Sequence, residues 1–182
     1  MRLIFCSLIA VAAFAQTPAA GVEPTWDMTV ILDQIGKDTA HLTPVLEQVS
    51  APAWVAKGAP DAYAAQLQSC KDQVRAITIE AAALARNPER VSAGLQLLFR
   101  FQGLEIMLLS LEDAARKYQT PQVAQSMAAA FAETGANRER FRKYLVNLAA
   151  DRERQFEVMD QEAQRCRTLL MAPPPKSTVR KK

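Results

Sequence analysis

Apolar side chains recur at alternating spacings of four and three residues along most of this chain. The clearest run reads Tyr63, Leu67, Cys70, Val74, Ile77, Ala81 and Leu84. This spacing places the side chains on one face of a helix, and it is the pattern by which long helices pack side by side. No stretch alternates apolar and polar residues beside glycine-rich turns, so nothing indicates a sheet. We therefore predict an all-α, up-and-down helical bundle of four to five helices.

Prolines and capping residues divide the chain into its helical segments. The predicted helices cover residues 25–49, 60–86, 88–118, 121–134 and 137–171. Inside the first, Pro44 removes a backbone hydrogen bond, so we expect a kink or a restart capped by Thr43. The third carries further apolar residues beside its main stripe, at Leu95, Leu98, Ile106 and Leu109, and should therefore be central and contact several neighbours.

The two ends of the chain differ from the bundle. Arg2, the apolar run that follows it and the small residues up to Ala15 are typical of a secretory signal peptide, predicted over residues 1–15. Residues 16–172 then form one bundle domain, and residues 173–182 a disordered basic tail. No later apolar run is long enough to span a membrane. We expect an exported protein, periplasmic or extracellular, with no membrane span in the mature chain.

The charge balance argues against a nucleic-acid partner. The chain has 22 basic and 19 acidic residues, and Arg2 would leave with the signal peptide. Four of the remaining basic residues lie in the last seven positions, so the bundle itself has 17 basic against 19 acidic residues. Nucleic-acid binding requires a basic face, and here the excess of basic residues is confined to the tail.

Two cysteines remain after signal removal, Cys70 and Cys166, and both lie on apolar stripes. In an oxidising compartment two cysteines most simply form one disulfide, with two buried free thiols as the alternative. A disulfide requires the second and last helices to run antiparallel, with a chain reversal near Gly135. One continuous helix over residues 121–171 would argue against it.

The sequence lacks the residues of common catalytic and metal sites. His41 is the only histidine, so a bundle di-metal site, which needs two carboxylate–histidine pairs, cannot be completed. The glycine motifs of nucleophile elbows and phosphate loops are absent. We therefore predict no enzyme, no metal and no cofactor. One alternative stays open, a non-covalent haem held by His41 and one methionine. The candidate methionines are Met28, Met107, Met127 and Met159.

Four other residues have two interpretations each. Glu105 and Arg152 lie beside and on the predicted stripes, where they could form a buried ion pair that fixes helix register. Alternatively, their long side chains both reach solvent. Trp54, in the connector before the second helix, and Tyr63 could anchor a partner or cover the end of the bundle.

Two stretches carry a resemblance, residues 54–60 (WVAKGAP) leading to Tyr63, and residues 162–167 (EAQRCR). Together they resemble a set of uncharacterised exported helical-bundle proteins of acidobacterial type. This resemblance implies no activity. The sequence predicts an exported, non-enzymatic bundle with a structural or protein-interaction role, whose partner is another protein or a second copy. The alternative is a bundle that binds haem or a small apolar ligand.

Overall fold

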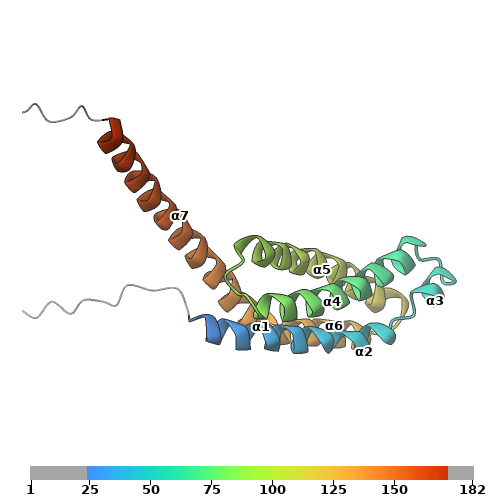
Figure 1. The fold of residues 1–182 in the computed structure, drawn as a ribbon. Coiled ribbons are helices and arrows are strands. Elements are labelled where there is room, and N and C mark those ends of the chain that lie inside the picture. Colours follow the sequence, from blue (N-terminus) through green and yellow to red (C-terminus); the bar gives the residue numbers. More distant parts are fainter. Residues whose placement is uncertain (1–23, 172–182) are drawn as a thin grey trace, which may run out of the picture.

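The computed structural model describes residues 24–171, which form seven helices and no strand. The helices are α1 (Thr25–Ala40), α2 (Leu42–Glu47), α3 (Ala51–Val55), α4 (Ala62–Ala85), α5 (Val91–Tyr118), α6 (Pro121–Glu133) and α7 (Gly135–Met171). In Figure 1, α1 and α2 run along the bundle, α4 returns, α5 runs forward again, and α6 with the start of α7 returns. The predicted all-α bundle is confirmed. The predicted signal peptide and basic tail lie outside the described residues.

The apolar stripes predicted from the sequence supply most of the core. The buried residues of α4 and α5 that belong to these stripes are Leu67, Cys70, Val74, Ile77, Ala81, Leu84, Leu97, Phe101, Leu104, Leu108, Leu111 and Ala115. The prediction that α5 is the central helix is wrong, because α5 contacts α4, α6 and α7 whereas α1 contacts α2, α4, α6 and α7. Of the second set of apolar residues on α5, Leu98 is partly buried against the core, and Leu95, Ile106 and Leu109 are exposed on its outer side. The neighbour expected for that side is absent from the described bundle.

The break predicted in the first helix is present near Pro44. α1 ends at Ala40, His41 forms a turn, and α2 begins at Leu42. A proline ring crowds the carbonyl four residues earlier, and for Pro44 that carbonyl belongs to Ala40. The break therefore precedes the proline, and Thr43 lies inside α2 and does not cap it.

The connector after α2 contains a short helix, α3, that the sequence did not predict. Gly58 follows it with a φ of 88°, a left-handed conformation that glycine adopts without strain. The chain turns there, and the Ala59 amide donates to the Trp54 carbonyl at 3.0 Å. This turn holds the Trp54 side chain, which is fully buried, edge-to-face against the Tyr63 ring at 6.0 Å between centroids. Trp54 and Tyr63 thus close one end of the bundle, as in the covering interpretation.

No chain reversal occurs between α6 and α7, contrary to the reversal that a disulfide would require near Gly135. Thr134 between the two helices has helical angles, φ −73° and ψ −14°, and the Arg138 amide donates to its carbonyl at 2.8 Å. Asn137, where the last helix was predicted to begin, is inside α7, and its amide contacts Asp38 at 3.5 Å. α7 therefore continues in the direction of α6.

This continuity makes the last helical segment longer than its neighbours. α5 has 28 residues, whereas α6 and α7 together extend from Pro121 to Met171. In an antiparallel pair that turns at residues 119–120, the start of α5 at Val91 faces α7 near Leu148. Beyond that level no helix of the described residues packs along α7, and in Figure 1 α7 leaves the bundle and projects away from it.

Candidate functional site

The projecting part of α7 is the most distinctive surface of the molecule. We call residues 152–171 the α7 arm, because every one of them is exposed. At 1.5 Å per residue the arm is about 30 Å long. A single exposed helix of this length gains little from intrinsic propensity and is ordinarily stabilised by packing against another element. The arm therefore offers a surface on which a second helix can pack.

An apolar stripe runs along the arm with the same spacing as the core stripes. Its members are Phe156, Met159, Ala163, Cys166 and Leu170. Phe156, Met159 and Leu170 are 69%, 66% and 87% exposed. The sequence predicted these positions to lie inside the bundle, and the structure places them in solvent. The prediction was wrong because spacing defines the face of a helix but not whether a neighbour reaches it.

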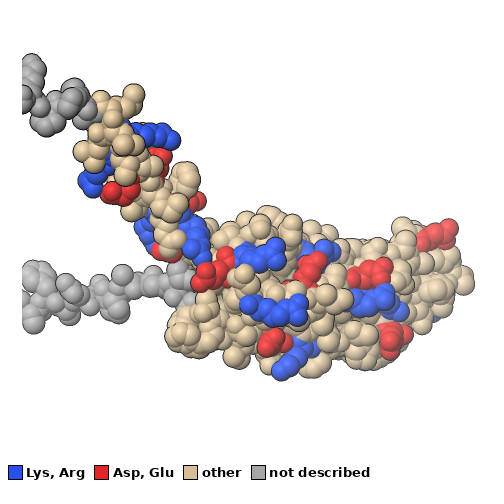
Figure 2. Space-filling model, viewed as in Figure 1, with Lys and Arg blue, Asp and Glu red and all other residues tan. Residues whose placement is uncertain are grey.

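The charges on the arm are balanced. Four acidic and four basic residues lie among residues 152–171, and Figure 2 shows the two signs interleaved along the projecting helix. Arg165 pairs with Glu162 at 2.9 Å within this helix. A helix that binds an anionic membrane surface carries an excess of basic residues, which the arm lacks. An apolar stripe flanked by both charges is typical of a helix that pairs with another helix.

An ion pair connects the base of the arm to the bundle. Arg152 donates to Glu89, just before α5, at 2.5 Å, and to Gln155 at 3.0 Å. Tyr144 is buried beneath this junction, and burial raises the pKa of its phenol. Of the two interpretations of Glu105 and Arg152, the buried pair is therefore wrong, because Arg152 lies at the end of the bundle with Glu89, and the solvent-reaching alternative agrees with the half-exposed side chains of both residues.

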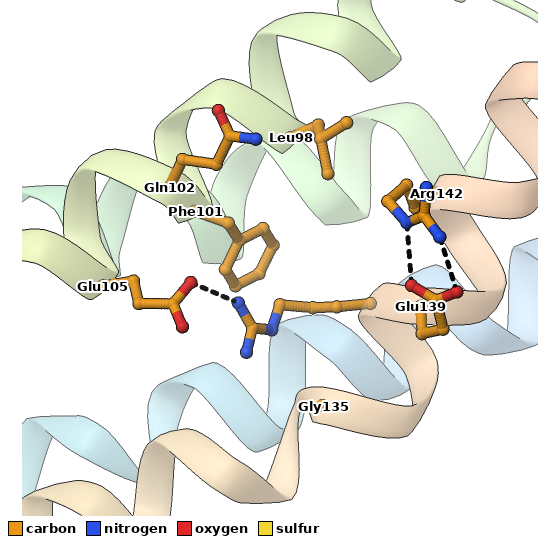
Figure 3. Close-up of a pocket in the computed structure, with 8 residues that line it drawn as sticks. Leu98, Phe101, Gln102, Glu105, Gly135, Glu139 and Arg142 are labelled. Carbon is orange, nitrogen blue, oxygen red and sulfur yellow. Dashed lines mark hydrogen bonds and ion pairs between the residues drawn. The ribbon is translucent and has the colours of Figure 1, made fainter.

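Glu105 instead belongs to a shallow hollow of about 230 Å³ between α5 and the start of α7, shown in Figure 3. Its carboxylate accepts from Arg138 at 3.4 Å. The Arg138 guanidinium stacks on the Phe131 ring at 4.2 Å and lies 5.5 Å from the Phe101 ring. Glu105 is half-exposed and Arg138 largely buried, so the pair sits at the edge of the core. Arg138 could not be recognised from the sequence, because its position along the helix does not distinguish it from the charged residues beside it.

The same hollow holds a second pair, already satisfied within α7. Arg142 donates twice to Glu139, at 2.8 and 2.7 Å, as the dashed lines in Figure 3 show. This hydrogen bonding lowers the pKa of the Glu139 carboxyl. The charged groups of the hollow therefore pair with one another. The arrangement fits a contact between α5 and α7 better than a site for a charged substrate.

His41, the residue of the haem hypothesis, lies on the surface. Its Nδ1 is 2.7 Å from the Glu133 carboxylate, and this hydrogen bond raises the pKa of the imidazole. Met28 and Met127 are fully buried in the core. These positions give the haem hypothesis no support. Among residues 24–171, no group of three or more His, Cys, Asp or Glu side chains is arranged to hold a metal ion.

The predicted disulfide between Cys70 and Cys166 is absent, because both are free cysteines. Cys70 is fully buried in α4, and burial raises the pKa of its thiol to about 12. Cys166 is exposed on the arm, beyond the end of the bundle. The continuous course of α6 and α7 carries Cys166 away from α4.

One described helix, α5, is long and apolar enough to cross a membrane by length and composition alone. No apolar segment of this length was predicted from the sequence. A core helix of a water-soluble bundle passes the same test, and α5 contacts α4, α6 and α7.

No family model, curated protein or solved structure matches this chain. The resemblance to exported acidobacterial-type proteins therefore stays a prediction.

Proposed function

We propose that this chain is an exported, non-enzymatic interaction module whose bundle holds the α7 arm in position for a helix of another protein molecule. The observation that carries this proposal is the apolar stripe of the arm, which is regular over residues 156–170 and wholly exposed. Burial of such side chains is favourable by about 25 cal/mol for each Å² removed from water. A partner helix gains this free energy without any rearrangement of the bundle.

The rest of the molecule supports a holding role. Trp54 and Tyr63 close one end of the bundle. At the other end, Arg152 at the base of the arm forms an ion pair with Glu89. Because the arm and part of the core belong to one helix, the arm is anchored by Phe141, Leu145 and Leu148, which are buried. The arm thus continues a helix that is already formed in the bundle, which reduces the conformational entropy lost when the arm pairs with another helix.

Site-specific crosslinking in the producing cells tests this function. A photoreactive phenylalanine analogue is placed at Met159, on the stripe, or at Gln161, on the opposite side of the same exposed helix. We expect a covalent protein adduct from position 159 and little from position 161. Both positions are exposed, so neither substitution disturbs the core. Equal yields at the two positions, or no adduct at position 159, would refute the docking role.

Fractionation of the same cells tests export. The protein should be recovered from the periplasmic or extracellular fraction, shortened by its first 15 residues. Recovery of the unprocessed chain in the cytosol would contradict the proposed location.

A further inference from the structure

We infer that the partner of the α7 arm is a second copy of this chain, and that the two arms pair as a parallel, in-register coiled coil with Cys166 facing Cys166. This inference rests on the proposed docking role of the arm. It goes further by naming the occupant of the stripe, the direction of the two helices and their register.

The arm follows a heptad repeat, written a to g, with apolar residues at a and d. Phe156, Ala163 and Leu170 occupy a, and Met159 and Cys166 occupy d. The g positions before the second and third a residues are Glu162 and Leu169, and the e positions after the two d residues are Asp160 and Arg167. Positions e and g flank the contact and determine which partner and which orientation a helix accepts.

In a parallel pair, each g residue faces the e residue of the following heptad in the other helix. Glu162 of one copy then faces Arg167 of the second copy, and by symmetry this ion pair forms twice. Gln155 faces Asp160 in the same way, an amide donor beside a carboxylate. The flanking side chains of the arm are therefore complementary to those of an identical arm.

In an antiparallel pair the flanking charges are partly repulsive, although Glu153 of each copy would face Arg167 of the other. The register that pairs Phe156 with Cys166 and Met159 with Ala163 brings Glu162 close to Glu162 of the second copy. It also brings Asp160 close to Asp160, so that like charges face each other on both sides of the contact. The charges of the arm thus favour the parallel orientation.

The orientation also determines what the cysteines can do. In the parallel pair the two Cys166 residues share one layer of the contact. In the antiparallel register they lie ten residues apart along the axis, about 15 Å, too far for a disulfide. A disulfide through Cys166 therefore reports the parallel orientation.

The stripe is short, about 21 Å from Phe156 to Leu170, so the noncovalent pair is expected to be weak. In an oxidising compartment a disulfide would make it permanent. With oxidised glutathione as the oxidant, the Cys166 thiolate attacks the glutathione disulfide and releases one glutathione thiolate. The Cys166 thiolate of the second copy then attacks the Cys166 sulfur of the mixed disulfide and releases the second glutathione. Two protein thiols are oxidised, and one glutathione disulfide is reduced to two thiols.

The first test compares cysteine positions in the full mature chain under a glutathione redox buffer. The natural Cys166 is compared with the double variant Cys166→Ser/Gln161→Cys, which moves the thiol to the opposite side of the arm. Non-reducing electrophoresis should show that the chain with Cys166 forms disulfide-linked dimers at least about 10-fold faster. Similar rates for the two chains would overturn the inference. Cys70 is fully buried in both chains.

The second test mixes two charge variants of different tagged length, Glu162→Lys and Arg167→Glu. Each variant alone brings like charges together in a parallel pair, whereas the mixture restores both ion pairs. We expect disulfide-linked heterodimers well above the roughly one-half that random pairing gives. A random mixture or an excess of homodimers would overturn the parallel register.

The crosslinking experiment separates this inference from the proposed function. An adduct at position 159 that joins two copies of this chain supports both. An adduct that contains only another protein supports the docking role and overturns the pairing of two copies. No adduct at that position overturns both.

Discussion

The side chain of Leu145 in α7 occupies the space next to the Cα of Gly94 in α5. A Cβ added at Gly94 would overlap the Cδ2 of Leu145 and lie 3.2 and 3.3 Å from its Cδ1 and Cγ. Leu145 is 2% exposed and therefore has little room to move. Gly94 allows α5 and α7 to approach closely at the end of the bundle from which the arm projects.

Gly94→Ala is expected to destabilise the protein. Overpacking of a filled core costs about 1–3 kcal/mol, more than the gain of up to about 1 kcal/mol from replacing a helical glycine by alanine. Gly103→Ala, in the same helix, is the matched control, because nothing lies within 4 Å of its added Cβ. It should raise stability by about 0.5–1 kcal/mol. Urea unfolding of both variants measures the difference, and equal effects would show that the close approach does not matter.

Gln119 is expected to be the main polar support of Trp54. Its Oε1 accepts from the Trp54 indole at 3.0 Å and from the Ser50 amide at 3.1 Å, and its Nε2 donates to the Gln48 carbonyl at 2.8 Å. Gln119→Ala leaves these groups unpaired and should cost about 1–3 kcal/mol. Gln119→Glu keeps the acceptor for the Trp54 indole and the Ser50 amide but brings a carboxylate oxygen toward the Gln48 carbonyl at an exposed contact, so its cost should be smaller than that of Gln119→Ala. Thermal unfolding ranks the variants, and a larger loss for Glu than for Ala would contradict this account.

The ion pair of His41 and Glu133 should make stability depend weakly on pH. The hydrogen bond that the His41 imidazole donates to the Glu133 carboxylate raises the pKa of His41 in the folded protein above its ordinary value. The pair therefore stabilises the folded protein fully below about pH 6.5, the pKa of a histidine in the unfolded chain. This stabilisation disappears as the pH rises through the pKa of His41 in the folded protein. Both side chains are more than half exposed, so the effect is small.

NMR can check this prediction directly, since His41 is the only histidine in the chain. The imidazole resonance should titrate at a lower pH in Glu133→Gln than in the natural protein. An unchanged titration would show that the pair does not form in solution.

Cys70 and Cys166 should differ strongly in reactivity after reduction. Burial raises the pKa of Cys70 to about 12 and excludes reagents, whereas Cys166 is exposed. A thiolate is the reactive species. Iodoacetamide at neutral pH should therefore modify Cys166 in the folded protein and Cys70 only after denaturation, as mass spectrometry of the peptides will show. Modification of Cys70 in the folded protein would contradict its position in the core.

Arg138 is expected to act through packing more than through charge. Its guanidinium stacks on Phe131, and its contact with Glu105 is long and partly exposed. Arg138→Met keeps an unbranched apolar side chain beside the ring without the charge, and should change stability by less than about 1 kcal/mol. Arg138→Ala removes the packing and should cost about 1–2 kcal/mol more. Calorimetry of the two variants decides between the roles, and a costly Met variant would favour charge.

The sequence was sufficient for the helices and their inward faces. The stripe of α4 from Leu67 to Leu84 is buried as predicted, and Thr120 with Pro121 marks the start of α6. Helix periodicity determines these features locally, so no tertiary information is needed.

The arm and the residues paired at its base could not be found from periodicity alone. The stripe from Phe156 to Leu170 has the same spacing as buried stripes, and its exposure follows from the shorter length of α5. From the sequence, α5 could be recognised as shorter than the last helical segment only if Gly135 was assumed not to break that segment. Glycine is frequent at helix ends, and here the helical conformation continues through it.

Because α7 belongs to both the bundle core and the arm, it also determines how a bound partner is oriented relative to the bundle. Leu148 is the last core residue of α7, and Phe156 is the first residue of the arm stripe. Each residue in an α-helix advances the chain by about 1.5 Å and turns it by about 100°. Insertion of a single alanine between Arg152 and Phe156 would therefore rotate the bundle by roughly a quarter turn about the axis of a bound arm, while the bundle core, the Arg152–Glu89 pair and the arm stripe keep their contacts.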